Sequence, residues 1–496
     1  MNTPKILAIA VSAALLAACG SDDNDNDDKK VVNAPETYTF PSKVTAGESS
    51  VSYSGQVARN ALINELKSVI GSGDLTTVDG EISLSAAVKQ KLALVYEGGT
   101  NGGTVNSGEA DLTNRNAYTL AAEKTPVGLS KKTADANFEE ADYTEISSGK
   151  NLVSKIAGVD NGLARDEFLG WNIAAVTVPS SITGKKDGEG NPLNITGEDS
   201  KPHALVQSWF DAVAANAAKG DAHPHSDYVS ETGLDYQQLV QKFLLGAVSF
   251  AQASDDYLKE SKGLLKGNSA GDKDGTKSYT PLEHQWDEGF GYFGAARDYN
   301  NYTDAQLKAQ KDNDTNGDNV IDLDSEYTFS MAQYANKRDA GITGADYSKT
   351  IMDNFLKGRQ IIQDNFGTDP VQGEGYHAEL TAVAKTIVMQ WEEILAANVI
   401  HYINDTLDDM ANIGDAEKYS FSAHAKHWSE MKGFALSLQF NPAATSAMTL
   451  QNLKDLNNYI GQAPKLTNDA DYRKQLEDAR TLLKTTFKFE GDVTTW

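Results

Sequence analysis

Apolar residues recur every three or four positions along much of the chain, which is the spacing of an amphipathic helix. In residues 56–70, Val57, Leu62 and Leu66 share one such face. A second periodic segment covers 83–98, with serine as its cap and Gly98 as its stop. The same spacing predicts further helices over 201–220, 235–261, 281–294, 346–367, 376–410, 421–440, 450–462 and 473–487.

Strand signals are scarce. The short segment "TYTF", residues 37–40, is β-prone, and residues 98–165 are rich in Gly, Asn, Thr and Ser with weak periodicity. From residue 165 onward the pattern predicts mostly helix. The sequence therefore predicts an all-α fold over residues 37–496, built as two packed helical bundles or one large irregular bundle. A subdivision near residue 165 or 345 stays open.

The N-terminus has the pattern of an export signal. A basic start is followed by an apolar run, residues 6–18, that is too short to span a bilayer permanently. The run ends in "LAAC", a small-residue pair before the only cysteine of the chain, Cys19, which is typical of a lipoprotein signal. We therefore predict that residues 1–18 are cleaved and Cys19 is lipidated. The alternative is an ordinary signal peptide with an incidental cysteine.

Residues 19–36 are acidic and almost free of apolar side chains, which predicts a disordered tether behind the lipid. Gly20, rather than an aspartate, follows the cysteine, and this favours the outer membrane, with a periplasmic or a surface-facing position left open. The chain has 70 acidic against 44 basic residues and a net charge of −26. Such a surface argues against nucleic acid as a partner and could attract cations.

The segment "KDNDTNGDNVIDLDSEY" resembles a calcium loop, because alternating acidic residues in a turn supply the hard oxygens that Ca²⁺ requires. Asn319 stands where glycine is usual, and the final acid comes one position late. The alternative is an acidic turn that binds no ion. The predicted ligands are Asp314, Asn316, Asp318, Val320 through its carbonyl, Asp322 and Glu326.

Histidines and carboxylates also fall together at helical spacing in "PLEHQWDEGFGYFG" and "HAKHWSE". Helical bundles build metal sites from such residues on facing helices, and imidazole with carboxylate suits iron, zinc or copper. The alternative is ordinary solvated helix faces. In both cases we expect Trp286, Phe290 and Phe293 to pack inward. The candidate ligands are Glu283, His284, Asp287, Glu288, His427 and Glu430.

Several segments resemble one bacterial lipoprotein family, domain of unknown function 4856: "SYSGQ", "GLDYQQLVQKFLLGA", "EHQWDEGFGYFG", "DTNGDNVIDLDSEYTFSMAQYANKRD" and "WSEMKGFALSLQFNP". The resemblance covers most of the chain from about residue 37. More distantly, the chain is similar to imelysin-like proteins, which are exported helical bundles linked with iron uptake. Their motif G-x-H-x-x-E is matched imperfectly, since "GYHAEL" places its acid, Glu379, one residue early.

These features predict a lipid-anchored envelope protein that binds a metal ion or metal complex in iron acquisition, with an uptake receptor as a further partner. A metal-dependent hydrolase with Glu288 or Glu430 as general base is the second hypothesis. A structural or partner-binding lipoprotein with only a stabilising calcium site is the third. Nothing in the sequence indicates a nucleophile.

Overall fold

The structure is a computed structural model that describes residues 32–71, 84–97, 137–138, 150–309, 313–318 and 320–496. The signal segment and Cys19 lie outside these residues. The described chain is mainly helical, which confirms the all-α prediction. Its helices are α1 Ser54–Gly71, α2 Leu84–Glu97, α5 Ser180–Thr183, α6 Lys201–Ala217, α7 Tyr236–Leu244, α8 Asp272–Gly275, α9 Pro281–Phe293, α10 Asp304–Ala309, α11 Ser330–Asp339, α12 Tyr347–Asp364, α13 Gly375–Asn412, α14 Phe421–Ser437, α15 Leu450–Ile460 and α16 Ala470–Phe487.

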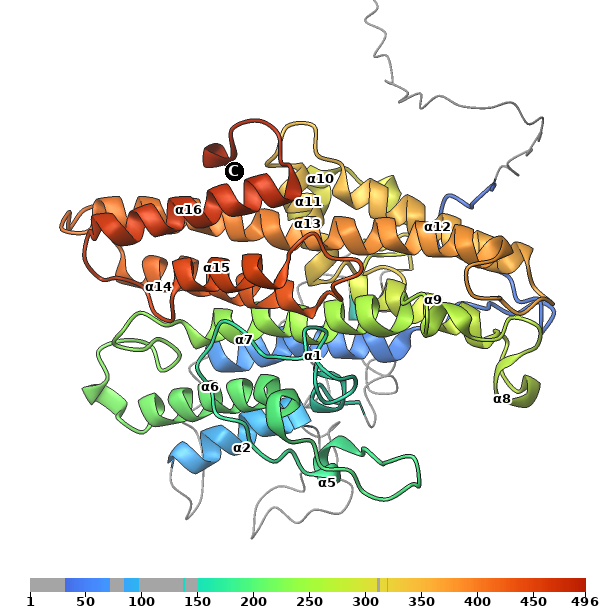
Figure 1. Cartoon of the computed structure of the whole chain (residues 1–496), viewed down its shortest axis with the longest axis horizontal. Helices are drawn as coiled ribbons and strands as arrows, with labels where there is room; N and C mark the ends of the chain where they lie inside the picture. The colour runs from blue at the N-terminus through green and yellow to red at the C-terminus, as the bar shows by residue number, and fades with distance from the viewer. Residues whose placement is uncertain (1–31, 72–83, 98–136, 139–149, 310–312, 319) are drawn as a thin grey trace, which may run out of the picture.

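The long helices stack in layers (Figure 1). Helix α13 packs against α12, α14 and α16, and α14 in turn packs against α7. Helix α1 lies against α7, α9 and α2, and α2 contacts α6 at the lower edge of the view. One hydrophobic core runs through these layers and includes the fully buried rings of Trp286, Trp391 and Trp428.

Helix α9 has clear sequence signals at both ends. Thr280 and Glu283 form a reciprocal capping box at its start, and Pro281 occupies the first turn. Gly294 ends the helix in the left-handed conformation. Trp286 and Phe290 are fully buried, so the prediction that the aromatic residues of this helix pack inward is confirmed.

Helix α7 crosses α14 at short range. Gly433 makes this possible, because a Cβ atom there would lie 2.5 Å from Cβ of Lys242. The helix predicted over 235–261 is observed from Tyr236 to Tyr257: after α7 it continues without a break through wider π-helical turns, Leu245–Phe250 and Ala253–Tyr257. Such turns are frequent at functional sites.

Two local predictions need correction. Residues 37–40 form no strand, and an isolated bridge joins Pro41 to Ser49 instead. The chain between residues 165 and 200 is mostly loop with the short helix α5, because glycines in the left-handed conformation such as Gly170 break helical periodicity. The strands of the described chain are β1 Asn137–Phe138 and β2 Val320–Ile321, which pair in parallel.

Short 3₁₀ turns join several helices, at Val153–Lys155, Gly197–Ser200, Gly220–Ala222, Gly263–Leu265, Tyr299–Asn301, Leu438–Phe440 and Val493–Thr495. Among the described residues, no helix combines the length and apolar character needed to cross a membrane.

Candidate functional site

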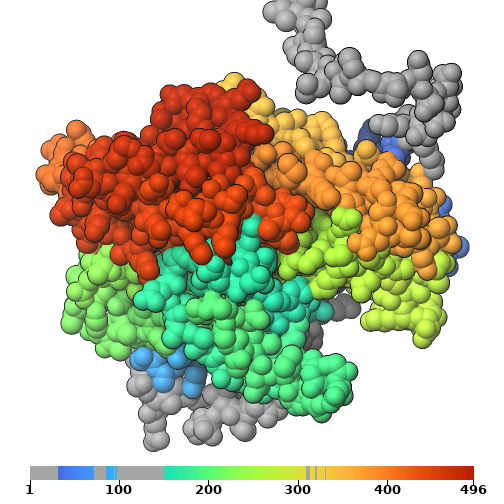
Figure 2. Space-filling model, viewed as in Figure 1, coloured from blue at the N-terminus to red at the C-terminus, as the bar shows by residue number. Residues whose placement is uncertain are grey.

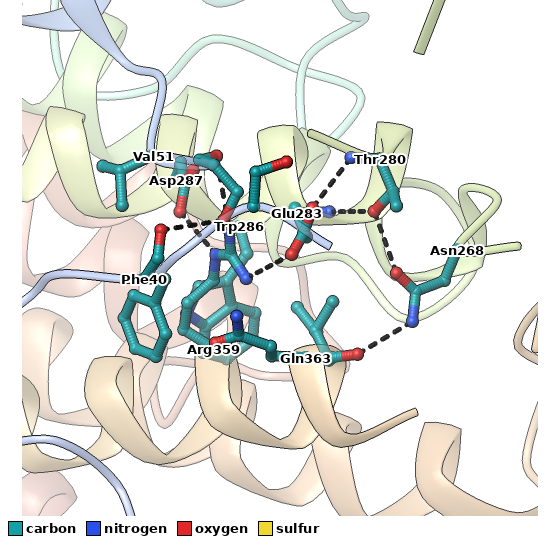
Figure 3. A network of polar contacts seen from close by, with 12 residues as sticks. Phe40, Val51, Asn268, Thr280, Glu283, Trp286, Asp287, Arg359 and Gln363 are labelled. Atoms are coloured by element: carbon teal, nitrogen blue, oxygen red, sulfur yellow. Dashed lines mark hydrogen bonds and ion pairs between the residues drawn. The ribbon is translucent and has the colours of Figure 1, made fainter. Parts of the chain in front are cut away.

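Two of the predicted ligands on α9 face the interior and meet an arginine. Glu283 and Asp287 are fully buried, as is Arg359 of α12 (Figure 3). Arg359 Nη1 donates to Glu283 Oε1 over 2.8 Å, and Arg359 Nε donates to Asp287 Oδ1 over 2.9 Å. Burial alone would lower the pKa of Arg359, but the charges of Asp287 and Glu283 outweigh this effect and raise it. The guanidinium therefore stays charged in a dry site.

Every carboxylate oxygen of this cluster has a partner. Glu283 Oε2 accepts the backbone N–H of Thr280 at 2.8 Å. Asp287 accepts the hydroxyl of Tyr38 at 2.8 Å and the backbone N–H of Ser52 at 3.0 Å. A closed buried network of this kind ties chain segments together and offers no unpaired oxygen to a metal. We name it the Arg359 network: Tyr38, Ser52, Thr280, Glu283, Asp287 and Arg359.

The other two candidates on α9 face a different side. His284 Nδ1 lies 2.9 Å from the carbonyl oxygen of Ser52, and its ring stacks on Tyr279 with 4.6 Å between centroids. Glu288 Oε1 accepts a hydrogen bond from Gln56 at 2.7 Å and lies 3.8 Å from His284 Nε2. These half-buried side chains fix the N-terminal segment against α9.

The candidates on α14 have partners of their own. His427 Nδ1 is 2.7 Å from Asp409 Oδ2 of α13, while Glu430 faces Lys242 of α7. Over the described part of the chain, no three His, Cys, Asp or Glu side chains converge so as to hold a metal ion. Helical spacing placed candidate residues on common helix faces, but side chains from other helices already pair with them. The structure therefore does not assemble one site from Glu283, His284, Asp287, Glu288, His427 and Glu430.

The calcium-like loop closes on Glu326, which is almost fully buried. Its Oε1 accepts the backbone N–H groups of Thr315 and Asn316, and its Oε2 accepts the N–H of Asp322. Both oxygens of this carboxylate, which the sequence predicted as a calcium ligand, therefore accept hydrogen bonds from the loop backbone. The side chains of Asp314 and Asn316 accept the next backbone N–H groups of the turn, those of Gly317 and Asp318. Val320 opens β2, Asn319 lies outside the described residues, and calcium binding stays a prediction.

A second buried ionic network lies where α7, α11, α13 and α14 meet. Lys242 is fully buried, and its ammonium donates to Gln238 Oε1 at 3.2 Å and to Gln241 Oε1 at 2.6 Å. It also lies 3.1 Å from Glu430 Oε1, which accepts the hydroxyl of Tyr402 at 3.1 Å. We name this the Lys242 network: Gln238, Gln241, Lys242, Tyr402 and Glu430.

The Lys242 network is incompletely paired. Glu430 Oε2 is buried without a hydrogen-bond partner, and so is Nε of the neighbouring Arg338. Burial alone would raise the pKa of Glu430, but the charge of Lys242 outweighs this effect and lowers it. This carboxylate is therefore charged at neutral pH. Burial lowers the pKa of Lys337, the residue before Arg338 on α11, to about 8. Buried polar atoms without a hydrogen-bond partner are costly, and groups with shifted pKa values concentrate at functional sites.

A pocket of about 480 Å³ opens beside this network, between the starts of α7 and α14. Asp235 Oδ1 caps α7 by accepting the N–H of Gln238 at 3.1 Å, and the N–H of Asp235 donates to Ser429 of α14 at 2.8 Å. Gln238 lines the pocket and also binds Lys242. The pocket wall is therefore continuous with the buried network.

Asp235 is the buried charge of the pocket. Its side chain is almost fully buried, and the charges of Lys67 and Lys242 offset only part of the cost of burying it. Burial, the largest cause, raises the pKa of Asp235 to about 6. The opposite wall is aromatic, because His225 stacks on Phe421 with 4.1 Å between centroids. Lys426 stands exposed at the rim.

These features define the molecule as an all-α protein with one closed ionic network and one open network beside a pocket. The chain belongs to the family described as Domain of unknown function (DUF4856), whose family model matches residues 203–464, more than half of the chain. No curated protein matches the chain, and no solved structure matches it. Both networks draw helices from the matched range, whereas Tyr38 and Ser52 of the Arg359 network lie before it. The imelysin-like similarity stays a prediction from the sequence.

Reasoning from the sequence missed Asp235, Lys242 and Arg359. Asp235 carried a usable signal, because an aspartate directly before a periodic apolar segment is a helix cap. Lys242 carried a weaker one, since it occupies the same helix face as the buried Leu239. Arg359 carried none, because its partners lie more than 70 residues away in the chain.

Proposed function

We propose that this chain is an exported, lipid-anchored binding protein whose ligand is a small organic cation held at Asp235. The observation that carries the proposal is a buried carboxylate, whose charge the nearby lysines only partly compensate, in a pocket of about 480 Å³. A pocket of this size suits a small molecule with one charged group.

The electrostatics of the pocket favour a cation. The pKa of Asp235 is raised to about 6 because burial penalises its charged form. A cationic ligand in contact with the carboxylate would remove that penalty. The net charge of −26 would also raise the local concentration of cations around the protein.

The walls favour an organic cation over a bare ion. The stacked pair His225 and Phe421 offers an aromatic surface, on which an ammonium or its apolar substituents can pack. Gln238 is held by Lys242 and Asp235 by Ser429, so the polar wall is preorganised. The Lys242 network thus acts as the support of the pocket.

The anchor is the lipidated Cys19 predicted above, with residues 19–36 as the tether that holds the folded part at the membrane surface. Stable anchoring needs more than one acyl chain, which lipoprotein processing of a single cysteine supplies. Palmitate labelling and membrane fractionation test this step. Wild type should be labelled and sediment with outer membranes, whereas Cys19→Ser should be unlabelled and soluble.

Ligand binding is tested with the soluble chain from Gly20 onward, using ethanolamine, putrescine and tyramine as probes. We expect at least one amine to bind, and Asp235→Asn to weaken it by about tenfold or more. Asparagine keeps the helix cap, so this variant should fold. Asp469→Asn is the matched control, because Asp469 caps α16 in the same way, away from the pocket.

Failure of all three amines, or equal binding by Asp235→Asn, would contradict the proposal. Iron, zinc, copper and calcium belong in the same titration. A transition metal bound in place of the amines would favour the metal-binding hypothesis, and the link to iron acquisition stays a prediction from the resemblance.

A further inference from the structure

A second pocket lies on another face, between the loop 169–172 and helix α15, with a volume of about 410 Å³. In Figure 2 the teal segment that contains this loop borders the orange-red surface of the C-terminal helices. The pocket has no residue in common with the one beside Asp235. Its main lining side chains are Trp171, Asn172, Lys454, Asn457, Asn458 and Gln462.

The inner wall of this pocket is built by close packing. Gly170 has a φ of +84°, and a Cβ atom there would lie 2.2 Å from Asn457 Oδ1. Only glycine therefore allows the loop to approach α15 this closely. The amide of Asn457 is held on both sides: its Nδ2 donates to the carbonyl of Leu453 at 2.9 Å, and its Oδ1 accepts from Lys432 at 3.1 Å.

Behind this wall lies a buried lysine that forms no ion pair with any carboxylate of the described residues. Lys432 is fully buried, and its ammonium is 5.9 Å from the ring centroid of Trp171. Burial lowers the pKa of Lys432 to about 7. The lysine thus donates a hydrogen bond to Asn457 from within the protein and lies beside the ring of Trp171.

Trp171 is fixed in place as the aromatic wall. Its half-buried ring meets Trp209 edge-on, with 5.4 Å between centroids and 89° between planes. A preorganised indole costs little conformational entropy when a ligand packs on it. The side chains around it are mostly amides, each of which offers both donors and an acceptor.

The charge at the rim is already compensated. Lys454 lies 2.8 Å from Glu167, so its ammonium is paired. Gln462 accepts the backbone N–H of Asn172 at 3.2 Å through Oε1, which orients its NH₂ group. The pocket therefore presents neutral donors and acceptors beside an aromatic ring.

We propose that the pocket between the loop 169–172 and α15 binds a neutral saccharide. Sugar hydroxyls both donate and accept, which matches amide side chains, and the C–H face of a pyranose ring packs on an indole. An anionic ligand fits less well, since the rim lysine is paired and Lys432 lies behind Asn457. This inference does not depend on the amine pocket, because the two sites share no residue.

A glycan array of neutral and acidic glycans, probed with the soluble chain from Gly20 onward, tests the proposal. We expect binding to at least one neutral glycan, with about tenfold or greater loss in Trp171→Ala and Asn458→Ala. Asn458 is exposed, so its replacement leaves the fold intact even if Trp171→Ala is destabilised. Gln451→Ala, an exposed amide on α15 outside the pocket, is the control and should bind as wild type does.

Three results would overturn the proposal: no neutral glycan bound, binding restricted to acidic glycans, or full binding by Asn458→Ala. Asp235→Asn should leave glycan binding unchanged. The glycan and amine measurements can therefore fail independently of each other.

Discussion

The Arg359 and Lys242 networks use the same chemistry, and differ in how completely they are paired: a buried cation faces two carboxylates in the first and one in the second. In the Arg359 network every carboxylate oxygen accepts a hydrogen bond. In the Lys242 network Glu430 Oε2 has no partner, and the cluster continues into the wall of a pocket. Closure indicates a structural joint, while incomplete pairing beside a cavity indicates a place where a ligand can act.

The largest effect should come from breaking the closed network. Arg359→Met leaves two buried carboxylates without their cation, and we expect it to lower the free energy of unfolding by about 4 kcal/mol. Lys349→Met, which removes an exposed ion pair on the same helix, should change it by less than about 0.5 kcal/mol. Urea unfolding of both variants checks this. Similar losses in the two would contradict a structural role for Arg359.

Breaking the open network should cost somewhat less. Lys242→Met leaves Glu430 buried and uncompensated, and we expect a loss of about 3 kcal/mol. The double variant Lys242→Met/Glu430→Leu should recover most of that loss, since one apolar pair replaces one ion pair. Urea unfolding checks this as well. If the double variant were no more stable than Lys242→Met, the ion pair would contribute more to stability than the mutual compensation of its two charges.

Replacing the pocket carboxylate should stabilise the protein. The pKa of Asp235 is raised to about 6 by burial, so the folded state is favoured below that pH and loses stability as pH rises from about 4 to about 6. At pH 8 we expect Asp235→Asn to be more stable than wild type by about 2 kcal/mol, and at pH 4 about equal. Unfolding curves at both pH values test this. A destabilised variant at pH 8 would make Asp235 a structural cap only.

The smallest effect concerns His427. Burial alone would lower the pKa of His427, but its hydrogen bond with Asp409 outweighs this effect and raises it. Stability from this pair is therefore present below the unfolded pKa of about 6.5 and is lost as pH rises through the folded value. His427→Ala should cost about 1 kcal/mol at pH 5.5 and almost nothing at pH 9. Asp409→Asn should remove the same pH dependence, and a cost independent of pH would point to packing instead.

Local signals in the sequence account for most of the helices. The cap at Thr280, the stop at Gly294 and the periodicity of α13 and α16 lie within each segment, so their helices were predictable. The loop between residues 165 and 200 was not, because it is held by distant contacts such as that of Gly170 with Asn457.

The site was only partly predictable, for the same reason. Helical spacing correctly placed His284 with Glu288 and His427 with Glu430 on shared faces. It could not show that Arg359, Lys242 and Asp409, from other helices, would supply the partners. Glu430 was the candidate nearest the proposed site, and its partner Lys242 lies almost 190 residues earlier.

The most direct test is the affinity of the tightest-binding amine measured by calorimetry from pH 5 to pH 8. If the amine pairs with ionised Asp235, wild type should bind most tightly above pH 6 and about tenfold more weakly at pH 5. Asp235→Asn should bind weakly at every pH. Equal affinity in wild type and Asp235→Asn, or wild-type affinity that does not change between pH 5 and pH 8, would contradict a cation site at Asp235.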